Sequence, residues 1–219
     1  MPTLVFISDT HTKHYEIDSQ LREIYENNQD AILIHSGDIS YRGRDWEVKE
    51  FVEWYASLPL KNKIMIAGNH DFLFEKEPYI ANEILNSLGP EIIYLNDSGA
   101  ELEGLKFWGS PVTPWFHNWA FNRLGHEIEH HWNIIPEDTN VLITHGPPYL
   151  TLDSTRSGLR VGCPVLSERI SQLKNLTIHV FGHIHEAAGI VEKDGVIYVN
   201  ASTLDLYYEV KNSPIILTI

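Results

Sequence analysis

The eight residues LVFISDTH, at positions 4–11, join a short apolar run to two side chains that can bind a metal ion. Four successive apolar residues, with β-branched and aromatic types among them, are typical of a strand that is buried on both faces. Asp9 and His11 follow at once, and side chains two positions apart point to the same side of an extended chain. The stretch therefore predicts a buried strand that ends in a pair of potential metal ligands.

The same arrangement recurs along the chain. Four more apolar runs lead into polar segments, at residues 31–34, 63–67, 141–144 and 177–181. The polar segments that follow them contain, in order, Asp38, Asn69 with His70, His145, and His183 with His185. Ligand sites in α/β sheets lie at the carboxyl ends of strands. Side chains that are far apart in the sequence are therefore expected to converge at one edge.

The wider pattern predicts a mixed α/β fold with two β-sheets. Strands are expected at residues 4–7, 31–34, 63–67, 92–95, 105–108, 141–144, 177–181, 188–191, 196–199 and 215–218, and helices at 19–27, 45–57, 79–88 and 164–174. The early order of strand, helix, strand, helix and strand is typical of right-handed βαβ units. Lys193-Asp194-Gly195 predicts a hairpin turn. No segment has the composition of a linker, so we expect a single domain over residues 1–219.

The composition limits the possible partners. The chain has 219 residues, of which 43% are hydrophobic, as expected of a folded globular protein. Its 30 acidic against 16 basic residues disfavour an extended nucleic acid, whose phosphates would be repelled. One cysteine, Cys163, cannot form a disulfide within the chain, and no apolar run predicts a signal peptide or membrane span. We therefore expect a cytoplasmic protein without a membrane partner, and the oligomeric state stays open.

The types of the candidate ligands favour two divalent metal ions. Imidazole, carboxylate and carboxamide groups without a thiolate suit manganese, iron, nickel or zinc, and Mn²⁺ is the expected ion. A carboxylate can bridge two cations, which makes Asp38 the natural shared ligand. Two ions at roughly 3.5–4 Å are the arrangement used for in-line displacement at phosphorus.

Each motif alone has an ordinary structural explanation. Gly68-Asn69-His70-Asp71 could be a simple turn, and a buried histidine beside a strand is usually a hydrogen-bonded core residue. However, burial of so many polar groups at five strand ends would be costly without a metal. The set as a whole therefore favours a metal site.

The ordered motifs D-x-H, G-D, G-N-H-D, H-G-P-P and G-H-x-H resemble those of the calcineurin-like metallophosphoesterases. Further segments look like the metallophosphoesterase-domain-containing subfamily of brain and fetal-tissue phosphodiesterases, among them Gly109-Ser110-Pro111 and Asn200-Ala201-Ser202-Thr203. The resemblance implies a four-layer α/β/β/α sandwich with two mixed β-sheets.

The resemblance also implies a role for each candidate residue. One metal ion would be bound by Asp9, His11 and His185. The second ion would be bound by Asn69, His145 and His183, and Asp38 would bridge the two. His70 would contact the phosphate and the leaving oxygen as a catalytic residue, and Asp71 would orient His70.

The expected reaction is hydrolysis of small phosphodiesters, such as 2′,3′- or 3′,5′-cyclic nucleotides, by a hydroxide that bridges the metals. Two dications, two aspartates and one hydroxide sum to about +1, which a diester monoanion neutralises. The alternative is a phosphomonoesterase that acts on proteins or nucleotides. A non-catalytic protein-binding scaffold is less favoured, because every motif position is intact. For either enzyme the expected partner is a small phosphoester.

Two surface features have more than one interpretation. The aromatic loop at residues 111–117, which ends in His117, could wall a nucleobase or aryl group, or could simply pack against the protein. Arg156 and Arg160 could bind a phosphate oxygen or form surface ion pairs.

Overall fold

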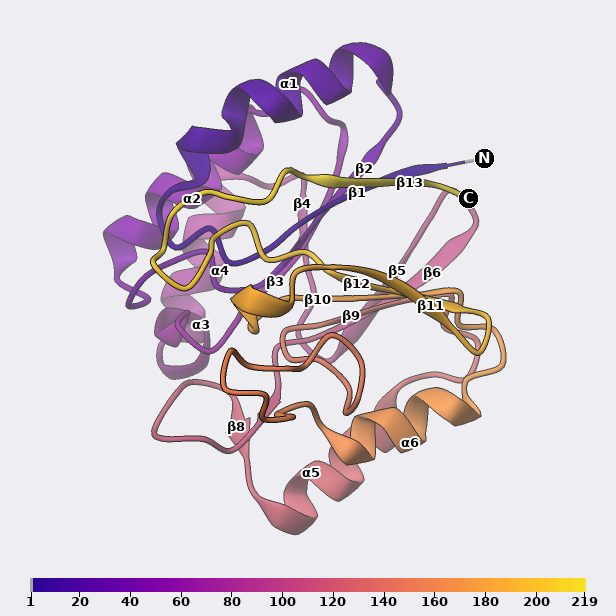
Figure 1. Ribbon diagram of the computed structural model, residues 1–219. Coiled ribbons are helices and arrows are strands. Elements are labelled where there is room, and N and C mark those ends of the chain that lie inside the picture. Colours follow the sequence, from indigo (N-terminus) through magenta and orange to yellow (C-terminus); the bar gives the residue numbers. More distant parts are fainter. Residues whose placement is uncertain (1) are drawn as a thin grey trace.

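The computed structural model describes residues 2–219. Two β-sheets lie face to face, and helices cover the outer face of each, so the layers follow in the order α/β/β/α (Figure 1). This is the four-layer architecture that the motifs imply. Among residues 2–219, no helix combines the length and the apolar character that crossing a bilayer requires.

The first sheet has the strand order β13–β1–β2–β3–β4. Its parallel strands are β1 (Thr3–Ile7), β2 (Ile32–Ser36), β3 (Asn62–Ile66) and β4 (Ile92–Tyr94). The edge strand β13 (Ile215–Thr218) pairs antiparallel with β1. The helices α1 (Asp18–Asn27), α2 (Asp45–Ser57) and α4 (Pro78–Leu88) connect the parallel strands and cover one face. These are the expected βαβ units.

The second sheet has the strand order β11–β12–β10–β9–β6–β5. Its strands are β5 (Ser98–Leu102), β6 (Leu105–Ser110), β9 (Val141–Thr144), β10 (Ile178–Phe181), β11 (Gly189–Lys193) and β12 (Val196–Asn200). The four inner strands are parallel, and both edge strands are antiparallel to their neighbours. The helices α5 (Gly125–His131) and α6 (Pro164–Gln172) cover the outer face. The predicted hairpin turn joins β11 to β12, with positive φ at Asp194 (52°) and Gly195 (79°).

Three apolar cores separate the four layers. In β1, Val5 packs against the helices of the first sheet, whereas Leu4 and Phe6 pack between the two sheets. The alternation follows from the two-residue period of a strand, and it explains why a continuous apolar run is needed there. Trp132 belongs to the third core, beneath α5 and α6. The middle core holds the two sheets together, with their ligand-bearing strand ends at one edge.

All the expected strands and helices are present, and the structure adds several short elements. These are η1 (His14–Ile17), α3 (Phe72–Lys76), β7 (Thr113–Pro114), β8 (Asn122–Arg123), η2 (Trp132–Ile134) and η3 (His185–Ala187). The strand β5 and the helix α5 were also not expected. The sequence of β5, SGAEL, has no β-branched residue, and the strand forms by pairing with β6 through a turn at Glu103 and Gly104.

Candidate dinuclear metal centre

The ends of five strands from both sheets meet at one place. Asp9 and His11 follow β1, Asp38 follows β2, Asn69 and His70 follow β3, His145 follows β9, and His183 and His185 follow β10. Three groups of ligand atoms each lie within 4.8 Å of one another, namely Asp9 with His11 and His185, His11 with Asp38 and His70, and Asp38 with His145 and His183. The structure thus brings together the side chains that were expected to converge.

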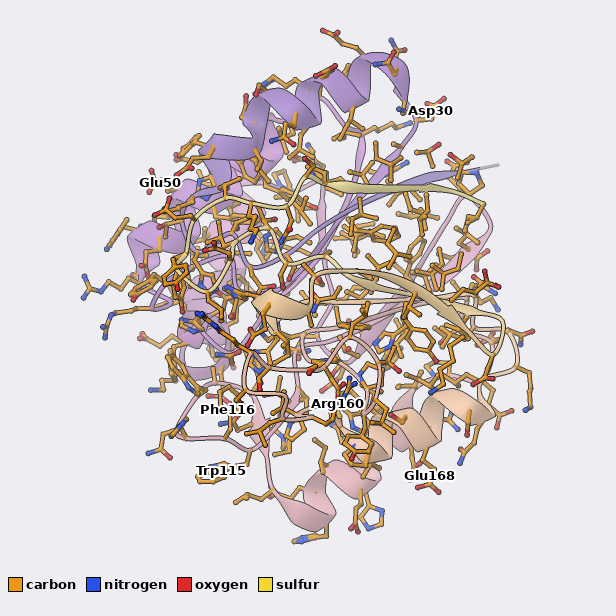
Figure 2. All side chains as sticks on the ribbon, in the orientation of Figure 1. Asp30, Glu50, Trp115, Phe116, Arg160 and Glu168 are labelled. Carbon is orange, nitrogen blue, oxygen red and sulfur yellow. The ribbon has the colours of Figure 1, made fainter. Side chains whose placement is uncertain are left out.

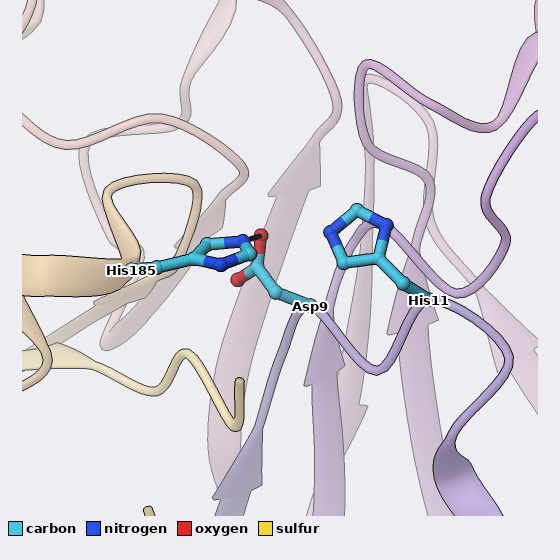
Figure 3. Close-up of side chains that lie close together, drawn as sticks. All are labelled: Asp9, His11 and His185. Carbon is cyan, nitrogen blue, oxygen red and sulfur yellow. Dashed lines mark ion pairs between the residues drawn. The ribbon is translucent and has the colours of Figure 1, made fainter. Parts of the chain in front are cut away.

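The first group surrounds the carboxylate of Asp9. His185 Nε2 lies 3.4 Å from Asp9 Oδ1, and the rings of His185 and His11 have centroids 5.4 Å apart. The two rings lie on either side of the carboxylate (Figure 3). These are the three residues expected to bind one metal ion.

Asp38 lies between the first group and the third, which contains His145 and His183. Its Oδ2 atom is 3.7 Å from His11 Nε2 and 3.3 Å from His145 Nε2. Its Oδ1 atom accepts a hydrogen bond of 2.8 Å from the backbone N–H of His70. His145 Nε2 also lies 2.9 Å from Asn69 Oδ1. A carboxylate that faces one imidazole from each group has the position of a bridging ligand.

Backbone carbonyls set the orientation of three imidazoles. The Nδ1 atoms of His11, His145 and His185 each lie 3.0 Å from a carbonyl oxygen, of Ser40, Ser36 and Asp205 respectively. A carbonyl only accepts, so Nδ1 carries the proton and Nε2 points to the centre. Within residues 2–219, His11 Nε2 is buried without a hydrogen-bond partner. A buried nitrogen without a hydrogen-bond partner destabilises the folded protein, and a cation at the centre would provide the missing partner.

The protonation states also suit a metal site. Burial lowers the pKa of His11 to about 4 and that of His183 to about 3, so both imidazoles are neutral ligands near pH 7. Burial acts the same way on His145 and His185, but the carboxylates of Asp38 and Asp9 outweigh it and raise both pKa values to about 9. These two imidazoles hold protons that a cation would displace.

Several ligand positions have unfavourable backbone geometry. The φ angles of Asp9 (51°), His11 (38°), Asp38 (56°) and His183 (69°) lie in the left-handed region, which most residues avoid. Such strain persists where surrounding contacts fix the backbone. Here the Asp9 carboxylate accepts hydrogen bonds from His183 N–H at 3.0 and 3.1 Å and from Ser202 Oγ at 2.9 Å. Ser202 thus supports the centre. The segment Asn200-Ala201-Ser202-Thr203 indicated a family resemblance in the sequence but gave no role for Ser202.

Gly182 leaves no room for a side chain beside the first group. A Cβ at this position would overlap Asp9 Oδ2 and Ser8 Oγ. We therefore expect Gly182→Ala to displace the Asp9 carboxylate, to cost about 1–3 kcal/mol of stability, and to lose one metal ion before the other. Metal analysis and thermal unfolding would measure both effects.

Gly146→Ala provides the matched control. Gly146 also follows a parallel strand of the second sheet, but its added Cβ would meet only the Thr113 side chain, with Cγ2 at 3.3 Å and Cβ at 4.0 Å. This variant should keep its metal content. If Gly182→Ala bound as much metal as the control, the packing around Asp9 would not govern the first group.

The His70 ring is positioned by groups other than Asp71. Its Nδ1 lies 2.9 Å from the Tyr41 carbonyl, to which it donates, and its ring stacks on Trp119 with centroids 4.2 Å apart. One ring nitrogen of His70 lies within 4.8 Å of ligand atoms of His11 and Asp38, and Nε2 is the nitrogen that the Tyr41 carbonyl leaves available. His70 therefore has the position of a proton donor beside the metal site.

The prediction that Asp71 orients the His70 side chain is wrong, because the Asp71 carboxylate binds other groups and the His70 ring is held by the Tyr41 carbonyl. The buried Asp71 carboxylate accepts hydrogen bonds from Gly68 N (2.7 Å), Ser40 N (2.9 Å) and Ser40 Oγ (2.6 Å). Burial and the nearby Asp38 charge raise its pKa to about 6. Asp71 therefore ties the loop after β2 to the loop after β3. Adjacent residues in a turn point in different directions, and only His70 turns toward the centre.

The loop at residues 111–117 forms a wall of the site. The Phe116 ring lies 5.0 Å from the His183 ring, and Trp115 is next to it on the same loop (Figure 2). Both line a largely apolar cavity of about 500 Å³ that reaches His183. His117 is exposed and does not line this cavity. Arg160 forms an ion pair with Asp153 at 2.8 Å, and the Arg156 guanidinium donates to Tyr207 Oη at 3.2 Å.

Comparison with known proteins agrees with this geometry. The family described as calcineurin-like phosphoesterase matches residues 2–187. The chain is 37% identical to metallophosphoesterase domain-containing protein 1 of Homo sapiens, over 97% of this chain and 69% of that protein.

Two solved structures share the fold at low sequence identity. A dimetal phosphatase from Danio rerio has a TM-score of 0.56 at 11% identity, over 90% of this chain and 86% of that one. An archaeal phosphodiesterase has a TM-score of 0.51 at 19% identity, over 98% of this chain and 99% of that one. These two likenesses concern the fold, whereas the family match over residues 2–187 and the relative at 37% identity lead to one conclusion. The chain belongs to the calcineurin-like phosphoesterase family, whose members are metal-dependent phosphoric ester hydrolases.

Proposed function

We propose that this protein is a phosphodiesterase that hydrolyses small phosphodiesters, such as 2′,3′- or 3′,5′-cyclic nucleotides, with two divalent cations of which Mn²⁺ is the first candidate. One observation carries the preference for diesters. A cavity of about 560 Å³ reaches His70 and a second of about 500 Å³ reaches His183, and they share no lining residue. An acyclic diester carries a separate organic substituent on each of two phosphate oxygens, so two cavities give each substituent a place.

The residues of the chain have separate tasks in this reaction. When bound, the two cations supply an activated water and offset the charge of the phosphate. Asp9, Asp38 and Asn69 would hold them from the first sheet, together with His11 and the three histidines of the second sheet. His70 donates a proton from Nε2 to the leaving oxygen, because its Nδ1 is engaged by the Tyr41 carbonyl.

Metal removal and a substrate comparison test this proposal. Metal-stripped protein should be inactive and should recover activity with Mn²⁺. The activities recovered with iron, nickel and zinc would rank these ions against Mn²⁺. The kcat/KM for bis(p-nitrophenyl) phosphate should exceed that for p-nitrophenyl phosphate by at least about tenfold. A panel of cyclic nucleotides then defines the substrate.

Two results would contradict the proposal in different ways. Full activity of metal-free protein would exclude the metal-dependent reaction. A higher kcat/KM for the monoester would show a phosphomonoesterase, which is the alternative function of such a site.

A further inference from the structure

The cavity beside His70 differs in chemistry from the apolar cavity beside His183. Its wall contains the cationic side chains Arg42, Arg44 and Lys76 together with the aromatic side chains of Trp119 and Tyr208. We call this cavity the His70 pocket. Arg42 and Arg44 flank Gly43 in the loop between β2 and α2, and Lys76 is the last residue of α3, so a loop and a helix end place their positive charges around one space.

The positive charge of the His70 pocket is unusual for this chain. The protein has 30 acidic and 16 basic residues, yet no acidic side chain lines the pocket within residues 2–219. Over the same described range, Arg42, Arg44 and Lys76 form no ion pair within 4.0 Å. Arg42 lies over the Tyr41 ring at 5.7 Å and Lys76 over the Phe72 ring at 4.5 Å. Ring faces hold the Arg42 and Lys76 cations without neutralising them. The Glu47 carboxylate accepts hydrogen bonds from the backbone N–H groups of Arg42 and Arg44 and not from their guanidinium groups. An anion in the pocket would therefore meet positive side chains that no ion pair neutralises.

An aromatic surface lies next to this charge. The half-buried Trp119 stacks on His70 with an interplanar angle of 27°, and the Trp119 and Phe72 rings have centroids 6.0 Å apart. Rings in such an array can stack on an aryl group or a nucleobase. The wall of the His70 pocket therefore matches a ligand with both an aromatic ring and a negative charge.

The position of His70 determines which part of a substrate enters the His70 pocket. His70 Nε2 is the atom that would donate a proton to the leaving oxygen, so the group attached to that oxygen lies on the His70 side. The retained substituent then lies in the apolar cavity that reaches His183. In the reaction, water adds to phosphorus and the P–O bond to the leaving group breaks. His70 gives its proton to the leaving oxygen, and a proton from the water replaces it.

On the basis of the proposed function, we propose that the His70 pocket selects phosphodiesters whose leaving group joins an aromatic ring to a second anionic group. A nucleoside that carries a further phosphate belongs to this class. The uncharged substituent stays on phosphorus in the apolar cavity, so the two cavities also set the direction in which an asymmetric diester is cleaved.

Two synthetic diesters of almost identical shape test the charge preference. Phenyl 4-carboxyphenyl phosphate carries a second negative charge on one aryl group, and phenyl 4-carbamoylphenyl phosphate does not. The wild-type protein should cleave the first with a kcat/KM about tenfold to hundredfold higher, because hydrogen bonds to charged groups are the stronger ones. It should release 4-hydroxybenzoate and retain the phenyl group on phosphorus.

Charge-removing variants distinguish the effect of the positive charges in the His70 pocket from the effect of the net charge of the protein. The triple variant Arg42→Gln, Arg44→Gln, Lys76→Gln should reduce the ratio of the two kcat/KM values to near one. The control Lys49→Gln, Lys61→Gln, Lys174→Gln removes the same charge from exposed sites outside the His70 pocket and should keep the wild-type ratio. Metal content of all three proteins should be equal.

Binding of the products gives a readout that does not depend on turnover. By calorimetry, wild-type protein should bind 4-hydroxybenzoate about tenfold more tightly than 4-hydroxybenzamide, and the triple variant should lose this difference. Equal kcat/KM values in the wild type, or an unchanged ratio in the triple variant, would overturn the inference while diesterase activity remains. No turnover of either probe or of bis(p-nitrophenyl) phosphate would overturn the proposed function, and the binding comparison would still decide the pocket.

Discussion

Asp38→Ala is expected to weaken the binding of both metal ions and to lower kcat by about 10³-fold or more, the upper range for loss of one electrostatic contact at a reaction centre. One oxygen of this carboxylate faces His11 and His145, which belong to different ligand groups. Its removal leaves imidazoles of both groups without the negative charge between them. Metal analysis and calorimetric titration with Mn²⁺ would measure the loss at each site.

Two further variants show whether the effect comes from bridging. Asp38→Asn retains an acceptor for the His70 N–H but removes the charge, so it should also lose metal. His11→Ala removes a ligand from one group only, so it should weaken one ion more than the other. Wild-type metal content and turnover in Asp38→Ala would show that this carboxylate does not bridge.

His70→Ala should keep both metal ions and lower kcat by roughly 10²–10⁴, the usual effect of losing a general acid or base. The ring has a free Nε2 at the centre, and a backbone carbonyl holds the other nitrogen. The loss should be largest for poor leaving groups such as those of cyclic nucleotides. It should be smaller for p-nitrophenyl esters, whose leaving group scarcely needs a proton. Steady-state kinetics on both substrate types, with metal analysis, would measure this.

A competing role for His70 is that of a metal ligand. A ring nitrogen of His70 lies within 4.8 Å of ligand atoms of His11 and Asp38, which is close enough for a shared cation. Loss of a metal ion from His70→Ala would therefore identify His70 as a ligand. An equal loss of rate on both substrate types, with both ions retained, would show that it binds phosphate without donating a proton.

The strands that carry the ligands were predictable because their signal is local. LVFI at residues 4–7 is typical of a strand buried on both faces, and a polar pair such as Asp9 and His11 directly after it marks the strand end. The strand β5 has no comparable signal, since its sequence SGAEL has weak strand preference and depends on pairing with β6. The short helix α3 is equally dependent on its surroundings.

The supporting contacts of the site were less predictable than its ligands. Asp71 is next to His70 in the sequence, but its carboxylate binds the loop after β2, and the ring is held by the Tyr41 carbonyl instead. A backbone carbonyl is present at every residue, so no sequence pattern could indicate this one. The pair Arg42 and Arg44, close behind Asp38 in an acidic chain, was a visible signal of the His70 pocket.

The distribution of the ligands over both sheets has a consequence for biosynthesis. During translation, Asp9, His11 and Asp38 leave the ribosome early, whereas His183 and His185 emerge only after β10. The strand β1 likewise gains its antiparallel partner β13 only after β10 has been made. Because domains generally fold as units, a nascent chain holds no complete metal centre. Both ligand sets can therefore be complete only after translation has passed His185 and the second sheet can form.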